Sequence, residues 1–126
     1  MGEETTKKIL IVEDQNELAL GLSSLLKSQG YVTTIANDGI YGTSQAHKGD
    51  IDLVILDLGL PAGGGFSVLA NLKSSTHTNN IPIIVLTAQQ GEESRNKAYK
   101  MGAQAFLNKP FDPEKLLDCI NRLIKK

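Results

Sequence analysis

The chain has 126 residues, of which 40% are apolar and 21% are charged, and its formal net charge is −1. The near balance of basic and acidic residues argues against a nucleic-acid-binding role, because such binding rests on many phosphate contacts made by Lys and Arg. No apolar run reaches the roughly 20 residues that cross a bilayer, and the first residues do not resemble a signal peptide. A chain of this length is expected to form one domain. Its single cysteine excludes an internal disulfide and suits a reducing compartment, so we expect a cytoplasmic location.

Short apolar segments alternate with segments of helical period in the first half of the chain. In order, the pattern predicts a strand, a helix, a strand, a helix and a third strand, at residues 9–12, 18–26, 31–36, 40–48 and 53–56. The first helix rests on a stripe of leucines between Leu18 and Leu26, and Gly30 ends it. Residues 1–6 precede the first strand and are expected to form a loose tail.

The second half continues the alternation. It predicts a helix, a strand, a helix, a short strand and a final helix, at residues 66–73, 81–86, 91–101, 105–107 and 113–124. The last helix is the clearest, since Asp112 suits its N-cap and Pro113 its first position. Lys125 and Lys126 suit its carboxyl end. Five such units with continuous apolar strands indicate an α/β fold whose parallel sheet is covered on both faces.

Polar side chains follow four of the predicted strands. In an open α/β sheet, ligands bind outside the carboxyl ends of the strands, so residues there share one edge. The residues in question are Glu13 and Asp14 after the first strand, Asp57 after the third, Thr87 and Ala88 after the fourth, and Lys109 after the fifth. Three carboxylates in one place repel each other unless a cation lies among them, and oxygen ligands suit Mg²⁺ or Mn²⁺.

Each of these residues also has a purely structural interpretation. Glu13 and Asp14 could cap the first helix, and Asp57 could be a turn residue before Gly59. Lys109 alone could be a solvated surface lysine. These interpretations weaken when all the positions fall at one edge. A metal and a lysine around one free carboxylate would instead form a site for phosphoryl transfer to that carboxylate.

Four segments carry a resemblance to a known family: ILIVED, LVILDLGLP, IIVLTA and GAQAFLNKPF. In this order and spacing they resemble the receiver domain of two-component response regulators. The resemblance implies a receiver domain at residues 7–126. It also implies a flavodoxin-like, doubly wound five-stranded parallel sheet of order 2-1-3-4-5 with five helices.

The resemblance implies a role for each residue at the predicted edge. Asp57 would be the phosphoacceptor, taking the phosphoryl group from a phosphohistidine of a histidine kinase or histidine phosphotransferase. Asp14, Asp57 and the backbone carbonyl of Gly59 would bind Mg²⁺ directly, and Glu13 would act through a water molecule. Three groups would hold the phosphoryl oxygens: the ammonium of Lys109, the hydroxyl of Thr87 and the backbone N–H of Ala88.

The family also implies a switch. On phosphorylation Thr87 would move toward the phosphoryl group and Phe106 would turn inward, reshaping the face of helix 4, strand 5 and helix 5 where a downstream protein docks. Phe106 stands where Tyr is frequent, so a phenolic hydrogen bond cannot serve this switch, and plain core packing is the alternative reading. A cis bond between Lys109 and Pro110 is expected as well.

The chain departs from the family near the expected phosphate. Gly64 stands where Asp is usual, and three successive glycines predict a mobile loop at residues 61–65. Gly59 and Gln89 occupy positions that vary in the family and influence the lifetime of the aspartyl phosphate. The remaining candidates give little evidence of a functional role. His47 and His77 lack the spacing of metal ligands, and Cys119 is expected to be inert. The glycines at positions 63–65 lack the Lys-Ser/Thr of a P-loop.

Three hypotheses compete for the function. The leading one is a receiver acting alone by protein contact, with no membrane or nucleic-acid partner, although the chain could be a piece of a longer protein. Such a domain is not a turnover enzyme and catalyses only its own phosphoryl transfer and dephosphorylation. A haloacid-dehalogenase-like phosphatase is disfavoured because Gly59 stands where its second acid belongs. A phosphate-independent scaffold is opposed by the complete set of acids with Thr87 and Lys109.

Overall fold

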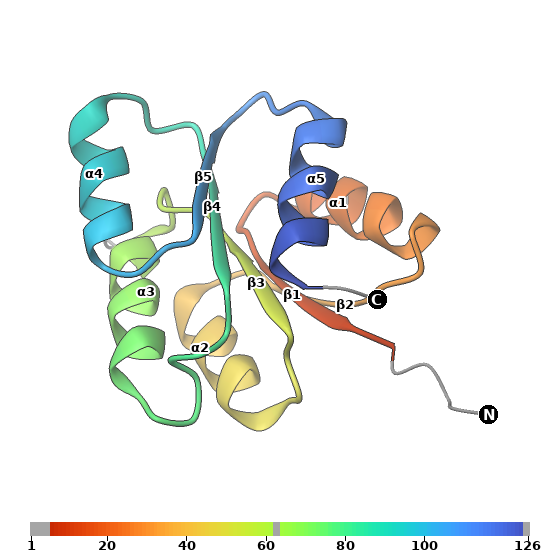
Figure 1. Cartoon of the computed structure of the whole chain (residues 1–126), viewed down its shortest axis with the longest axis horizontal. Helices are drawn as coiled ribbons and strands as arrows, with labels where there is room; N and C mark the ends of the chain where they lie inside the picture. The colour runs from red at the N-terminus through yellow and green to blue at the C-terminus, as the bar shows by residue number, and fades with distance from the viewer. Residues whose placement is uncertain (1–5, 62–63, 125–126) are drawn as a thin grey trace.

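Strands and helices alternate along the chain, as the sequence predicts (Figure 1). The computed structural model describes residues 6–61 and 64–124. The strands in these ranges are β1 (Lys8–Val12), β2 (Val32–Ala36), β3 (Leu53–Leu56), β4 (Ile83–Thr87) and β5 (Ala105–Asn108). The helices are α1 (Asn16–Ser28), α2 (Gly39–Lys48), α3 (Gly64–Ser74), α4 (Glu92–Lys100) and α5 (Pro113–Leu123).

The strands form one parallel sheet in the order β2-β1-β3-β4-β5, which confirms the predicted fold class. The chain first moves from β1 outward to β2 and then returns to β3 on the other side of β1. This reversal lies between β1 and β3, where Val12 is in register with Leu56. The carboxyl ends of these two strands therefore flank the point at which open α/β sheets bind ligands.

Helices cover both faces of the sheet, with α2, α3 and α4 on one side and α1 and α5 on the other (Figure 1). A hydrophobic core lies on each face of the sheet, and each strand contributes side chains to both because its side chains alternate between faces. In β1, Leu10 and Val12 pack toward α2 and α3, whereas Ile9 and Ile11 pack toward α1 and α5. None of the helices in the described ranges combines the length and the apolar character that a bilayer crossing needs.

Two predicted strand boundaries shift for reasons of hydrogen bonding. Tyr31 was expected to open the second strand, but its backbone N–H donates to Leu26 O and so closes α1 instead. Ile81 was expected to open the fourth strand, but its N–H donates to Thr78 O in the preceding turn. Periodicity marks the apolar run, whereas the backbone partner decides where the strand begins.

The glycine-rich segment after β3 differs from its prediction where it is described. Gly64 and Gly65, which were expected in a mobile loop, form the first residues of α3. A Cβ added at Gly65 would lie 2.3 Å from Leu58 Cα, so the glycine lets the helix contact the backbone that leaves β3. Other parts of these expectations fall outside the described residues: the tail before residue 6, the loop positions 62 and 63, and the two lysines at positions 125 and 126.

Candidate functional site

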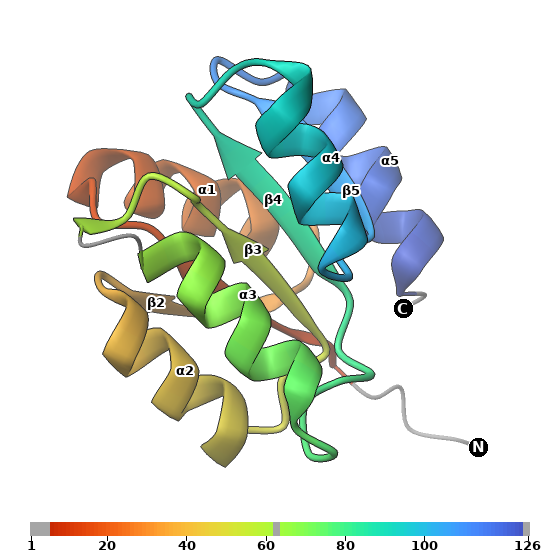
Figure 2. The same ribbon diagram turned by 90° about the vertical axis from the view of Figure 1, so that its left-hand side faces the viewer.

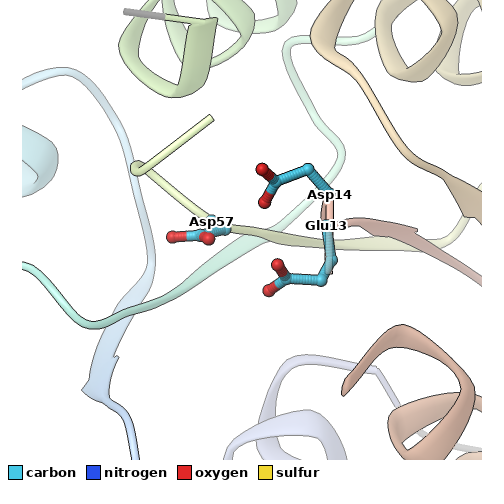
Figure 3. A group of neighbouring side chains, drawn as sticks. All are labelled: Glu13, Asp14 and Asp57. Carbon is cyan, nitrogen blue, oxygen red and sulfur yellow. The ribbon is translucent and has the colours of Figure 1, made fainter. Parts of the chain in front are cut away.

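Three carboxylates meet at the carboxyl ends of β1 and β3 (Figure 3). Glu13 and Asp14 directly follow β1, and Asp57 directly follows β3. The backbone N–H of Asp57 donates to Val12 O at 3.1 Å, which holds the two strand exits side by side. One ligand oxygen from each acid lies within 4.8 Å of the others. The sequence prediction that these acids converge is therefore confirmed.

Lys109 follows the edge strand β5 and pairs with two of the acids. Its Nζ lies 2.7 Å from Glu13 Oε1 and 3.1 Å from Asp57 Oδ2. Its backbone N–H donates to Thr87 O at 2.9 Å, which ties the residue to the end of β4. The peptide bond between Lys109 and Pro110 is cis, as expected. The predicted lysine thus lies in the acid cluster and not on an open surface.

Burial and charge act on this cluster in opposite directions. Burial raises the pKa of Glu13, and the charge of Asp57 adds to the rise, although hydrogen bonds from Lys109 and from the Gln15 N–H oppose it. Burial lowers the pKa of Lys109, but its hydrogen bonds and charge pairing with Glu13 and Asp57 outweigh burial and raise that pKa overall. The ammonium group is therefore held in its charged form between two acids.

The donor set suits a hard divalent cation. Asp57 and Glu13 are buried, while Asp14 is exposed and makes no hydrogen bond or ion pair with any described residue. Asp57 Oδ1 accepts the Gly59 N–H at 2.9 Å and Oδ2 accepts Lys109, so both oxygens have fixed directions. Lys109 pairs with two of the three acids, so the cluster holds more carboxylates than ammonium groups and leaves negative charge for a cation to offset. All-oxygen ligands with solvent access fit Mg²⁺ better than zinc.

Thr87 and Ala88 lie at the same edge but make no hydrogen bond to the three acids among the described residues. Thr87 is fully buried, and its Oγ1 accepts the Gln89 N–H at 3.2 Å. Ala88 is exposed. Phe106 is partly buried and packs against the core on the α2, α3 and α4 side. The structure therefore brings Glu13, Asp14, Asp57 and Lys109 together, with Thr87 and Ala88 one strand away.

Comparison with known proteins identifies this arrangement. The model of the response regulator receiver domain family matches residues 9–121, which is most of the chain. The chain belongs to this family. It is a receiver domain of the kind found in two-component response regulators.

Curated relatives are longer than this receiver. It is 38% identical over 119 residues to a probable transcriptional regulator, ycf29, of Pyropia yezoensis, covering 94% of this chain and 54% of the relative. It is 34% identical to the transcriptional regulatory protein PcoR of Escherichia coli, covering 95% of this chain and 52% of that protein. The chain thus spans about half the length of the curated relatives it matches.

Solved receiver structures agree closely in fold. A response regulator from Chloroflexus aurantiacus aligns with a TM-score of 0.89 at 28% identity, over 97% of this chain and all of that chain (100%). The chemotaxis protein CheY4 of Vibrio cholerae aligns with a TM-score of 0.88 at 29% identity, over 95% and 100%. The receiver domain of sensor histidine kinase PA1611 from Pseudomonas aeruginosa, solved with magnesium coordinated in its active site cleft, aligns at 0.87 and 29% identity, over 97% and 100%.

Two asparagines near the site were not predicted from the sequence. Asn37 follows β2 and donates through Nδ2 to Glu13 O at 3.0 Å, which braces the acid pair from the neighbouring strand. Asn108 ends β5 and donates to Thr87 O at 3.3 Å and to Gln89 O at 2.9 Å. Both side chains donate to backbone carbonyl oxygens, and no sequence motif predicts such hydrogen bonds. The available signal was their position, since each lies at the carboxyl end of a strand next to the expected site.

Proposed function

We propose that Asp57 accepts a phosphoryl group from a phosphohistidine on a histidine kinase or histidine phosphotransferase. The observation that carries the proposal is the Lys109 ammonium, which lies within hydrogen-bonding distance of Asp57 and Glu13 while Asp14 stays free beside them. A purely structural ion pair needs only one acid. A nucleophilic carboxylate flanked by a cation and by two further acids is what phosphoryl transfer needs.

The residues act mainly by positioning and by charge. The Gly59 N–H and Lys109 hold the Asp57 carboxylate, and one of its oxygens bonds to phosphorus as the bond to the donor histidine nitrogen breaks. The imidazole leaves with the electron pair of that bond. Lys109 would pair with the phosphoryl oxygens, and the Thr87 hydroxyl and the Ala88 N–H, at the end of β4, would donate to them.

The acid cluster would hold Mg²⁺. We assign Asp14, Asp57 and the backbone carbonyl of Gly59 as direct ligands and Glu13 as a ligand through water, and the magnesium in the cleft of the Pseudomonas aeruginosa relative supports this choice of ion. When bound, the ion offsets the negative charge of the carboxylates and of the incoming phosphoryl group. Glu13 keeps its own partners, Lys109 and the Gln15 N–H, so its oxygens are already oriented.

The output of the domain would be a change of surface and not a reaction product. Phosphorylation adds charge and acceptor oxygens at Asp57. Thr87 and Phe106 would respond, and the face of α4, β5 and α5 would present itself to a downstream protein. Because position 106 carries Phe, the response rests on ring packing. The domain would catalyse only its own phosphorylation and dephosphorylation.

Phosphate uptake from acetyl phosphate tests the proposal. We expect intact-mass measurement to show one added phosphate in the wild type with Mg²⁺ and much less when the metal is chelated. The Asp57→Ala variant should gain none. Asp118→Asn is a matched control, because Asp118 is an exposed acid on α5 and is not a member of the cluster. A wild type that gains no phosphate, or an Asp57→Ala variant that gains as much, contradicts the proposal.

A further inference from the structure

The residues of helix α4 are mostly exposed to solvent. Of its nine residues Ala98 alone is buried, and Gly91 at its N-cap provides no side-chain hydrogen bond. Lys97 contacts the neighbouring helix α3, because its Nζ lies 4.2 Å from the centroid of the Phe66 ring. The two helices lie on the same face of the sheet (Figure 2). A cation over an aromatic face is attracted to it, so this contact is a measurable part of what holds α4.

The residue before Phe66 is in contact with the backbone of the phosphoacceptor. A Cβ added at Gly65 would lie 2.7 Å from Asp57 O and 2.6 Å from Leu58 O. No gap therefore separates the first turn of α3 from the chain that leaves β3. A displacement of the Asp57 and Leu58 backbone has to displace this turn, because close-packed atoms transmit strain.

Phe66 also shares a core with the expected switch residue. Its ring and that of Phe106 both pack against the cluster that contains Leu58 and Ala98. Contacts thus run without a break from the Asp57 backbone through Gly65 and Phe66 to Lys97 on α4. This route lies on the α3 side of β4, and it does not pass through Thr87.

We propose that Phe66 and Lys97 form a latch that holds α4 on α3 and couples phosphorylation at Asp57 to α4 through the first turn of α3. The coupling half of this inference rests on the proposed function. The new charge on Asp57 shifts the backbone on which Gly65 rests, the Phe66 ring moves with the helix, and its contact with Lys97 weakens. The α4 helix then opens more often, because Ala98 remains its one buried residue.

Hydrogen exchange of the backbone amides of α4, followed by mass spectrometry, measures the latch. Lys97→Met removes the charge but keeps the stem, and Lys97→Arg keeps a cation that can lie over the ring. Phe66→Leu removes the ring but keeps an apolar side chain. Lys100→Met is the matched control, an exposed lysine on the same helix outside the contact with Phe66.

In the unphosphorylated protein we expect Lys97→Met and Phe66→Leu each to speed exchange in α4 by about two- to fivefold. Lys97→Arg and Lys100→Met should stay near the wild type. Exchange in α4 of the double variant should be slower than the product of the two single effects predicts, because the two residues share one contact. Beyond the effect of Lys97→Met, the double variant should add only the packing that is lost when Leu replaces the Phe66 ring. Lys97→Met behaving like Lys100→Met, or fully multiplicative effects in the double variant, overturns the latch.

The coupling is tested by repeating the measurement with Mg²⁺ and acetyl phosphate. We expect phosphorylation to speed exchange in α4 of the wild type and to change it less in Lys97→Met, whose latch is already open. An equal response in both overturns the coupling. Intact mass of the same samples reports whether a phosphate has been added, and the Asp57→Ala variant shows whether Asp57 carries it. A wild type without phosphate refutes the proposed function and the coupling, and the unphosphorylated comparison still decides whether the latch exists.

Discussion

At Lys109 a single ammonium group holds acids from two strands in place. Its bonds to Glu13 and Asp57 span the sheet from the end of β5 to the ends of β1 and β3. Glu13 is buried and its pKa is raised chiefly by that burial, which disfavours the charged carboxylate. The lysine offsets this cost, and its second hydrogen bond fixes the direction of Asp57 Oδ2.

The raised pKa of Lys109 makes a prediction about stability and pH in metal-free solution. The folded-state pKa lies above the ordinary value of 10.5, so the stabilisation is complete below pH 10.5 and is lost as pH rises through the folded-state pKa. We expect Lys109→Met to lower the free energy of unfolding by about 1–3 kcal/mol at pH 8. The difference from the wild type should shrink above pH 10.5.

Urea denaturation across this pH range, with a chelator present, measures both effects. Lys100→Met serves as the control, since that side chain is exposed and its removal should change stability little at any pH. A Lys109→Met difference that grows as pH rises toward 11 would mean that the ammonium does not stabilise the acids.

At the level of elements, the approach of α3 to the β3 exit sets the geometry around Asp57. Gly65 begins that helix where a side chain would meet Leu58 Cα at 2.3 Å, whereas nothing lies within 4 Å of a Cβ added at Gly21 in α1. Both glycines lie in helices, but a side chain would have room at Gly21 and none at Gly65.

Alanine substitutions at these glycines should therefore act in opposite directions. Gly65→Ala should lower the free energy of unfolding by about 1–3 kcal/mol, because backbone atoms have to move. Gly21→Ala should raise it by about 0.5–1 kcal/mol, because alanine favours the helix and meets no neighbour. Thermal or urea unfolding of the two variants decides this, and a Gly65→Ala protein as stable as the wild type contradicts the packing described here.

The sequence predicts the existence and order of the elements well for a physical reason. The strands β1, β3 and β4 are buried apolar runs. The helix α5 begins at the capping residue Asp112, whose carboxylate accepts the Glu114 N–H at 3.0 Å. Boundaries that depend on a distant or backbone partner were missed. Tyr31 shows this, because its N–H closes α1 although its side chain suits a strand. The start of α3 shows it too, because glycine composition indicates a loop and only packing reveals the helix.

At the level of the whole molecule, the site comes from strand ends that are far apart in the chain. Position at a strand end was enough to predict that Glu13, Asp14, Asp57 and Lys109 converge, since a parallel sheet collects its carboxyl ends at one edge. Which atoms touch was not predictable in this way. The braces from Asn37 and Asn108 and the Phe66–Lys97 contact depend on side-chain directions that only the packed structure fixes.

The central claim of the proposed function is that residues at the ends of β1 and β3 form one divalent cation site around Asp57, with Lys109 beside it. Calorimetric titration of the metal-free protein with Mg²⁺ tests it most directly, using the wild type, Asp14→Asn and the control Asp118→Asn. We expect one ion per chain in the wild type and in the control, and an affinity at least about tenfold weaker in Asp14→Asn, where a direct charged ligand is lost. An absence of Mg²⁺ binding in the wild type, or an unchanged affinity in Asp14→Asn, would contradict the account.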